Sequence, residues 1–273
     1  MAGPSETKNM ALFCDFENIA LGVRDAKYAQ FDINKVLERL LLKGGIVVKK
    51  AYCDWDRYKD FKAAMHQASF ELIEIPHVRQ SGKNSADIRM VVDALDLCYT
   101  KSHVDTFVII SGDSDFSSLV SKLRENNKVV IGVGVKNSTS DLLIANCDEF
   151  IYYDDLVREQ EGKKRRGRKP AGKAASGAVT APAAKENDKK QQALDLIIET
   201  IEALSAERGE EEKIWGSMVK QALKRRNPGF NEAYYGFRSF SKLLEEAETR
   251  KLLELERDEK SGGYIIRNVT HED

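Results

Sequence analysis

The chain has 273 residues, of which 42% are hydrophobic and 32% charged, enough for a sizeable core in one large domain or two smaller ones and typical of a soluble protein. No apolar run of about 18 residues is present, and the N-terminus lacks a basic stretch followed by an apolar one, so we expect neither a membrane span nor a signal peptide. The four cysteines are far apart and form no CxxC pair, which favours reduced core residues of a cytoplasmic protein over zinc ligands or disulfides.

The formal net charge of -1 hides an uneven distribution along the chain. Residues 1–157 carry 19 basic and 23 acidic side chains, residues 158–188 carry 9 and 4, and residues 189–273 carry 15 and 17. Positive charge is therefore concentrated in the middle of the chain. We predict a domain at residues 10–157, a basic disordered linker at 158–188 and a second domain at 189–273.

The first domain alternates short apolar runs with amphipathic segments. Strands are expected at residues 11–14, 45–53, 70–75, 105–110, 128–135 and 149–153. Helices are expected at residues 31–43, 57–68, 85–100, 116–126 and 139–147. Strand and helix in strict turn predict an α/β fold with a mostly parallel sheet and helices on both faces. In such sheets the functional site lies beyond the carboxyl ends of the strands.

The middle segment is rich in Ala, Gly and Lys and has no apolar stripe, which is typical of a disordered linker. Its basic residues Arg165, Arg166, Arg168 and Lys169 surround a glycine in an Arg-Gly-Arg-Lys-Pro sequence. This sequence resembles an AT-hook core that enters the minor groove of DNA. A general polybasic tether for RNA or DNA phosphates is the interpretation that we prefer.

The C-terminal segment shows a different pattern. Amphipathic helices are expected at residues 191–204, 215–226 and 234–248, followed by two strands within residues 252–268 joined by a Gly-Gly turn. Three helices followed by a hairpin predict a small winged helix-turn-helix fold.

Acidic residues follow two of the predicted strands in the first domain. Asp113 and Asp115 follow the apolar run that ends at residue 110, and Asp15 ends the first strand, with Asn18 three residues further on. Taken singly, these residues have a structural explanation: Asp115 could cap the helix that follows, and Asp15 and Asn18 could form turns. Like charges placed together are, however, unfavourable unless a cation is bound between them.

A fourth carboxylate is expected from the helix at residues 85–100. On a helical wheel, Asp87 lies at the border of the apolar stripe and in the first turn, so we expect it to face the site. Asp93 lies nearly opposite the stripe and is expected to be solvated. Asp15, Asp87, Asp113 and Asp115 would then converge on one edge of the sheet, where their oxygens suit Mg²⁺ or Mn²⁺.

Four sequence blocks resemble the NYN domain, in the LabA-like branch of the PIN-like nuclease superfamily. They are FCDFENI, KNSADIRMVVDALDL, SGDSDFSSLVSKLRENNKVVIGVG and NCDEFIYY, within residues 10–155. The resemblance implies a Rossmann-like fold and a metal-dependent ribonuclease. It also implies catalytic roles for Asp15, Asn18, Asp87, Asp113 and Asp115. The same resemblance keeps Asp93 as a further candidate acid.

Basic residues could bind an anionic substrate at two places. Lys83 and Asn84 precede Asp87 in a glycine-containing loop, although a solvated loop lysine is an equally good interpretation. Residues 190–270 resemble the OST-HTH/LOTUS domain, a family associated with RNA binding and, in some branches, with protein partners. The basic residues of its second predicted helix are Lys220, Lys224, Arg225 and Arg226.

Two functions are consistent with these features. The first is a Mg²⁺- or Mn²⁺-dependent ribonuclease whose linker and C-terminal domain recruit RNA. The alternative is a non-catalytic nucleic-acid-binding adaptor with a vestigial acidic site. The retained cluster of costly like charges favours the enzyme.

Overall fold

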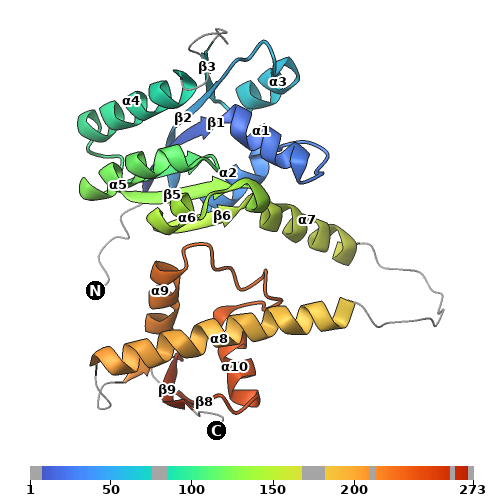
Figure 1. Cartoon of the computed structure of the whole chain (residues 1–273), viewed down its shortest axis with the longest axis vertical. Helices are drawn as coiled ribbons and strands as arrows, with labels where there is room; N and C mark the ends of the chain where they lie inside the picture. Colours follow the sequence, from blue (N-terminus) through green and yellow to red (C-terminus); the bar gives the residue numbers. More distant parts are fainter. Residues whose placement is uncertain (1–7, 76–84, 168–181, 209–212, 259–261, 270–273) are drawn as a thin grey trace, which may run out of the picture. The chain divides into compact units, whose positions relative to one another are not determined.

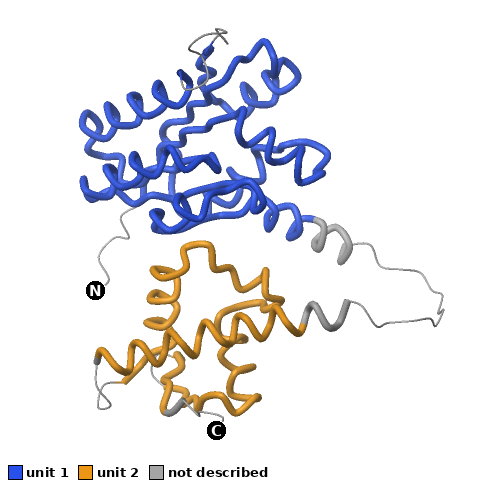
Figure 2. The backbone as a smooth tube through the Cα atoms, viewed as in Figure 1, with its two compact units in different colours: residues 1–167 blue, residues 168–273 orange. Residues whose placement is uncertain are grey.

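The computed structural model describes residues 8–75, 85–167, 182–208, 213–258 and 262–269 (Figure 1). The chain divides into two compact units, residues 1–167 and 168–273 (Figure 2).

A six-stranded sheet forms the centre of the first unit, with the strand order β3-β2-β1-β4-β5-β6. Every neighbouring pair in this sheet is parallel. The strands are β1 (Asn9–Asp15), β2 (Gly45–Cys53), β3 (Glu71–Glu74), β4 (Thr106–Ile110), β5 (Val129–Gly134) and β6 (Glu149–Tyr152). The predicted parallel α/β fold is confirmed.

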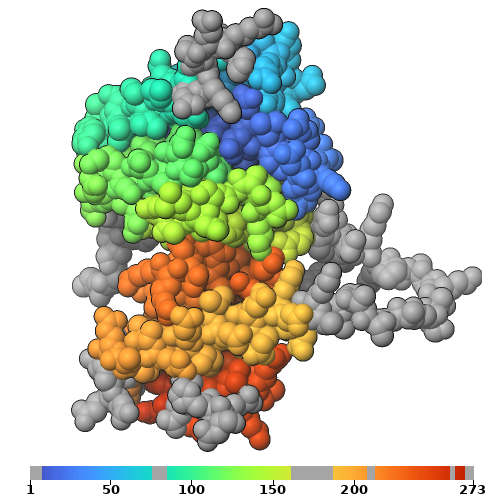
Figure 3. Space-filling view, in the orientation of Figure 1, coloured from blue at the N-terminus to red at the C-terminus, as the bar shows by residue number. Residues whose placement is uncertain are grey.

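Helices cover both faces of the sheet (Figure 1). One face carries α1 (Phe16–Asp25), α2 (Ile33–Leu41), α3 (Lys59–Gln67) and α7 (Tyr153–Gly167). The other carries α4 (Ser85–Thr100), α5 (Ser117–Glu125) and α6 (Asp141–Asn146), and α4 and α5 lie side by side on the surface seen in Figure 3. Two 3₁₀ turns, η2 (Ser114–Phe116) and η3 (Lys136–Ser138), follow β4 and β5.

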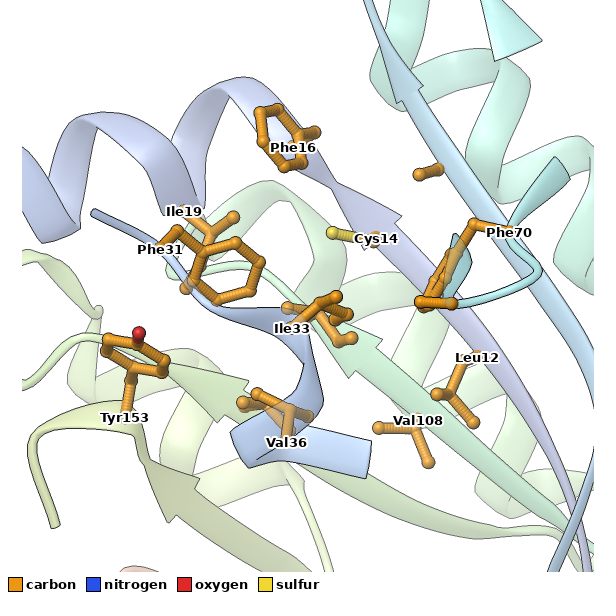
Figure 4. Close-up of a cluster of buried hydrophobic side chains, with 14 of the residues drawn as sticks. Leu12, Cys14, Phe16, Ile19, Phe31, Ile33, Val36, Phe70, Val108 and Tyr153 are labelled. Carbon is orange, nitrogen blue, oxygen red and sulfur yellow. The ribbon is translucent and has the colours of Figure 1, made fainter. Parts of the chain in front are cut away.

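The side chains of β1 alternate between two hydrophobic cores, as expected for a strand covered on both faces. Leu12 and Cys14 point into the first core, where Figure 4 shows them with Val108 of β4 and residues of α1 and α2. Ala11 and Phe13 belong to the second core. A sheet buried on both sides leaves its carboxyl edge as the place where polar side chains can gather.

Two helices of this unit were not expected from the sequence. Helix α1 begins at Phe16, directly after β1 ends at Asp15, so no loop separates the strand from the helix. Helix α7 begins directly after β6 and continues to Gly167.

The second unit contains three helices and a small antiparallel sheet among its described residues. Its elements are α8 (Pro182–Arg208), β7 (Ile214–Trp215), α9 (Gly216–Arg226), α10 (Phe240–Thr249), β8 (Leu253–Arg257) and β9 (Tyr264–Val269). The sheet has the order β7-β9-β8, and β7 was not expected. The predicted winged-helix-like arrangement is confirmed. Its core includes Leu194, Ile197 and Ile201 of α8.

The segment predicted as a disordered linker is helical at both ends. Helix α7 continues to Gly167, and α8 begins at Pro182. Ala, Lys, Glu and Gln are good helix formers, so a helix can extend into this segment although it has no apolar stripe. Residues 168–181, with Arg168 and Lys169, lie outside the described residues.

All four cysteines are free and buried, as expected. In the described part of the chain, no helix is both long and apolar enough to cross a membrane.

Candidate functional site

The acidic residues gather where β1 and β4 end. These two strands are neighbours in the sheet, with Cys14 opposite Ile110. The chain proceeds from β1 toward β2 and β3 on one side, and β4 leads toward β5 and β6 on the other. The ends of β1 and β4 therefore form the topological switch point, where α/β proteins place their sites.

Asp15 is held in place by two hydrogen bonds. Its Oδ1 accepts from the backbone N–H of Asn18 at 3.3 Å, which makes Asp15 the N-cap of α1. Its Oδ2 accepts from the Ser111 hydroxyl at 2.9 Å. Burial and the charge of Asp87, together with that of Asp113, raise the pKa of Asp15 to about 7 against the lowering effect of these hydrogen bonds.

Asp87 lies in the first turn of α4 and belongs to the same acidic group. Burial and the charges of Asp113, Asp115 and Glu17 raise its pKa to about 6. The charge of Asp87 therefore acts together with those of the carboxylates that follow β1 and β4. Glu17, in the first turn of α1, is a further acid that the sequence analysis did not include.

The loop after β4 is fixed by hydrogen bonds within the site. The Ser111 hydroxyl accepts from the backbone N–H of Asp113 at 3.1 Å, and the Gly112 N–H donates to Asn18 Oδ1 at 2.8 Å. Asp113 Oδ1 in turn accepts from the N–H of Asp115 at 3.0 Å, so Asp113 caps η2. Asn18 thus connects α1 to this loop.

Gly112 is required by close packing. A Cβ atom at this position would lie 2.4 Å from the backbone oxygen of Ser138, far inside van der Waals contact. The loop can therefore approach η3 only with glycine here.

Ser111 was missed by the sequence analysis, although it precedes two predicted acids. It is fully buried, and its hydroxyl joins Asp15 to the loop of Asp113. A buried hydroxyl needs a hydrogen-bond partner, so a serine directly after a buried strand was the available signal.

The orientation of α4 differs from the helical-wheel prediction. The helix buries Met90, Ala94 and Cys98 against the sheet, whereas Ile88 and Val92 are 62% and 56% exposed. The helical wheel assigned the buried face from the large aliphatic side chains. The face that is buried instead carries small or unbranched side chains, which allow the helix to approach the sheet closely.

Asp93 is consequently not solvated, and that prediction is wrong. Its carboxylate accepts from the Tyr52 hydroxyl at 2.9 Å, from Lys50 Nζ at 3.3 Å and from Arg89 Nε at 3.0 Å. Burial disfavours its charge, but these partners outweigh burial and lower the pKa of Asp93. Its partners are thus Tyr52, Lys50 and Arg89, and Asp93 is not among the main charges that raise the pKa of Asp15 or Asp87.

The predicted substrate-binding residues are only partly described. Lys83, Asn84, Arg168 and Lys169 lie outside the described residues, and for Arg165 and Arg166 the structure describes only a helical backbone in α7.

The four basic residues singled out in the second unit lie on α9, and three of them, Lys224, Arg225 and Arg226, belong to its last turn. Arg226 pairs with Glu199 of α8, and Lys220 pairs with Glu232 at 2.8 Å. Part of this positive charge is therefore engaged within the domain itself, and basic residues in a last turn also complement the helix dipole.

Within the described residues, no group of three or more His, Cys, Asp and Glu side chains is arranged to hold a metal ion. The donors at the site are nevertheless carboxylate oxygens, which suit hard cations. Mg²⁺ commonly uses one or two protein carboxylates and completes its shell with water and phosphate oxygens. The donor set therefore fits such an ion in kind.

Family profiles match both units of the chain. The profile of the NYN domain matches residues 9–154, which is more than half of the chain, and that of the OST-HTH/LOTUS domain matches residues 187–265. The predicted boundaries after residues 157 and 188 stay predictions.

Individual relatives match about half of the chain. Meiosis regulator and mRNA stability factor 1 from Xenopus tropicalis is 23% identical over 150 residues, 55% of this chain and 9% of that protein. An uncharacterized protein from Methanocaldococcus jannaschii is 27% identical over 145 residues, 52% of this chain and 57% of that protein. The chain thus matches less than two thirds of the length of either relative.

A crystal structure of a Vibrio parahaemolyticus protein of unknown function is also similar. It has a TM-score of 0.49 and 28% sequence identity, and the match covers 56% of this chain and 96% of that chain.

Proposed function

Because the chain belongs to the NYN-domain family of the PIN-like nuclease superfamily and carries an OST-HTH/LOTUS domain, we propose that it is a divalent-metal-dependent ribonuclease. These two domains support an RNA-related role as nuclease or regulator. The name of the Xenopus relative, an mRNA stability factor, favours RNA over DNA as the substrate.

One observation carries the proposal of catalysis. Asp15 and Asp87 come from different elements, and each is subject to the charge of Asp113. In the folded chain, both have pKa values raised toward neutrality, to about 7 and about 6. Such a set of carboxylates is unfavourable for the fold alone and becomes favourable when a cation binds among them.

In this proposal, Asp15, Asp87, Asp113 and Asp115 would hold Mg²⁺ or Mn²⁺, which supplies an activated water and offsets charge on the scissile phosphate. The hydrogen bonds of Ser111 and Asn18 orient Asp15 and the loop after β4. This fixes the carboxylates before substrate arrives and lowers the reorganisation needed during the reaction.

Recruitment of RNA is assigned to the OST-HTH/LOTUS domain and the basic middle segment. The candidate phosphate-binding residues there are Arg165, Arg166, Arg168, Lys169, Lys224, Arg225 and Arg226, and near the acidic site Lys83 and Asn84. DNA binding by the Arg-Gly-Arg sequence and a protein partner of the C-terminal domain stay predictions, as does a cytoplasmic location.

A cleavage assay tests this function. Labelled single-stranded RNA is incubated with wild type, Asp113→Asn and Asp96→Asn in Mg²⁺, in Mn²⁺ and in chelator. Asp96 is an exposed acid on α4 and serves as the matched control. We expect cleavage by wild type and Asp96→Asn, and a loss on the order of 100-fold or more in Asp113→Asn, the scale of an active-site electrostatic contact.

Cleavage that persists in chelator and in Asp113→Asn would contradict the proposed mechanism. RNA binding by wild type without cleavage in either metal would favour the adaptor function instead.

A further inference from the structure

The geometry points to Arg57 as a residue that binds an RNA phosphate beside the acidic site. This inference rests on the proposed ribonuclease function and adds to it the group that receives the negatively charged substrate. It concerns a part of the sheet edge that the sequence analysis did not consider.

Arg57 follows β2, the neighbour of β1 on the side away from β4. The two strands are parallel, and Asp15 at the end of β1 lies opposite Tyr52, next to the last residue of β2. The turn after β2 therefore emerges at the same carboxyl edge as the acids. Arg57 is part of this turn, and its N–H donates to the carbonyl of Asp54 at 3.1 Å.

The turn is anchored by a buried tryptophan. Trp55 is 1% exposed, and its ring centroid lies 4.9 Å from that of Phe16, the first residue of α1. Its backbone N–H donates to Glu74 at 2.9 Å, and its indole N–H donates to the carbonyl of Ile73 at 3.2 Å. A side chain two residues further on is thus presented from a fixed backbone, as positioning of a substrate requires.

Glu17 connects Arg57 to the acidic group. Arg57 Nη1 lies 3.2 Å from Glu17 Oε1, and Glu17 is two residues after Asp15 in the first turn of α1. The charge of Glu17 also acts on Asp87. The guanidinium therefore lies on the border of the carboxylate group.

The ion pair itself contributes little to stability. The side chains of Arg57 and Glu17 are 51% and 37% exposed, so water screens the attraction between them. The guanidinium has five N–H donors in a planar fork, which matches two oxygens of a phosphate. Arg57 can therefore exchange Glu17 for a phosphate at low cost.

An acidic site also needs such a cation. A polyanion approaching Asp15, Asp87, Asp113 and Asp115 is repelled unless positive charge flanks the path. Arg57 provides this charge. Because it pairs with Glu17, it does not neutralise the carboxylates that are proposed to hold the metal before substrate binds.

The salt dependence of RNA affinity tests the inference. Binding of a labelled single-stranded oligoribonucleotide is measured in Mg²⁺ over a KCl series with Asp113→Asn protein, which is expected not to cut. Adding Arg57→Ala should lower the slope of log affinity against log salt by about 0.7, the value for one phosphate contact on a single strand. Affinity at about 0.15 M salt should fall on the order of tenfold, as for one charge-assisted hydrogen bond. Arg57→Lys should keep the slope but recover only part of the affinity.

Two further variants serve as controls. Arg39→Ala removes an arginine that is similarly paired, with Glu159 at 2.5 Å, but lies in the last turn of α2, which leads to the opposite end of β2. It should leave the slope unchanged. Glu17→Gln removes the competing carboxylate and should tighten RNA binding.

The outcomes separate this inference from the function on which it rests. Wild-type cleavage together with an unchanged slope in Arg57→Ala overturns the role of Arg57 and leaves the ribonuclease in place. Equal losses of melting temperature in Arg57→Ala and Glu17→Gln, with RNA affinity unchanged, assign the pair to stability and also overturn it. A wild type that neither binds nor cuts RNA overturns both proposals.

Discussion

Asp15 and Asp113 each serve the fold in a way that is independent of any reaction. Asp15 caps α1 and Asp113 caps η2, through hydrogen bonds from Asn18 and Asp115. Capping was expected of Asp115, but the side-chain caps in the structure are Asp15 and Asp113, and α5 has no side-chain cap. Capping thus accounts for Asp15 and Asp113. It does not account for Asp87, whose carboxylate lies beside theirs and shares their charge. At the scale of the residue, capping explains the positions of Asp15 and Asp113, and the proposed cation would offset the repulsion between the clustered carboxylates.

The raised pKa of Asp15 predicts how stability depends on pH when no metal is bound. The ordinary value of 3.8 applies to the unfolded chain and about 7 to the folded one. The folded state therefore holds its proton more tightly, and stability is present below about pH 4 and is lost as the pH rises toward 7. Asp15→Asn removes this loss and keeps a residue that can cap a helix.

In chelator, we expect Asp15→Asn to melt several degrees above wild type at pH 7.5, with the difference shrinking toward pH 4.5. Melting temperatures of both proteins across this pH range measure it. An Asn variant that is less stable than wild type at neutral pH would mean that the Ser111 and Asn18 hydrogen bonds make the Asp15 carboxylate a structural group.

Asp93→Asn should behave in the opposite way. The substitution removes the charge that pairs with Lys50 and Arg89 in a site where the Asp93 side chain is 12% exposed. We expect a loss of about 1–3 kcal/mol in the free energy of unfolding, with kcat of the folded protein unchanged. Denaturant unfolding and cleavage in Mn²⁺ measure the two quantities.

Asp96→Asn, on the exposed side of α4, is the control and should change neither quantity. If Asp93→Asn instead keeps full stability and loses cleavage as Asp113→Asn does, Asp93 belongs to the reaction and not to the network with Tyr52.

At the scale of the element, the strands β1, β4 and β5 were predictable because each is an apolar run buried on both faces of the sheet. The order of strand and helix then placed the site at the ends of β1 and β4. Helix α1 was not predictable from a break in the pattern, because its N-cap is the last residue of β1. The buried face of α4 was predicted wrongly, because Ile88 and Val92 belong to its apolar stripe but are exposed to solvent.

The residues that sequence analysis missed are those whose role depends on tertiary contact. Ser111 acquires its role because Oδ2 of Asp15, 96 positions away in sequence, accepts its hydrogen bond. Arg57 lies near the acidic residues because β2 pairs with β1 and because Trp55 anchors the turn that follows β2. Periodicity and spacing describe neighbours along one element, and they carry no information on which side chains meet across strands.

At the scale of the whole molecule, the two units have separate cores. The first has one core on each face of its sheet, and the second packs α8, α9 and α10 around residues such as Leu223 and Leu244. The acidic site is contained in the first unit, because Asp15, Asp87, Asp113 and Asp115 all belong to it. Chemistry and recruitment can therefore be separated by experiment.

We predict that residues 1–167 alone fold and keep metal-dependent cleavage. Loss of the second unit should raise KM for RNA roughly tenfold or more, because a tethered binding domain increases the effective concentration of substrate, and kcat should stay within about twofold. Steady-state kinetics on one RNA measure both values for the full chain and for the fragment. Adding residues 168–273 as a separate chain should not restore KM, since the gain depends on the covalent connection. If kcat falls while the fragment stays folded, the second unit takes part in the reaction itself, and the acidic site is not complete within the first unit.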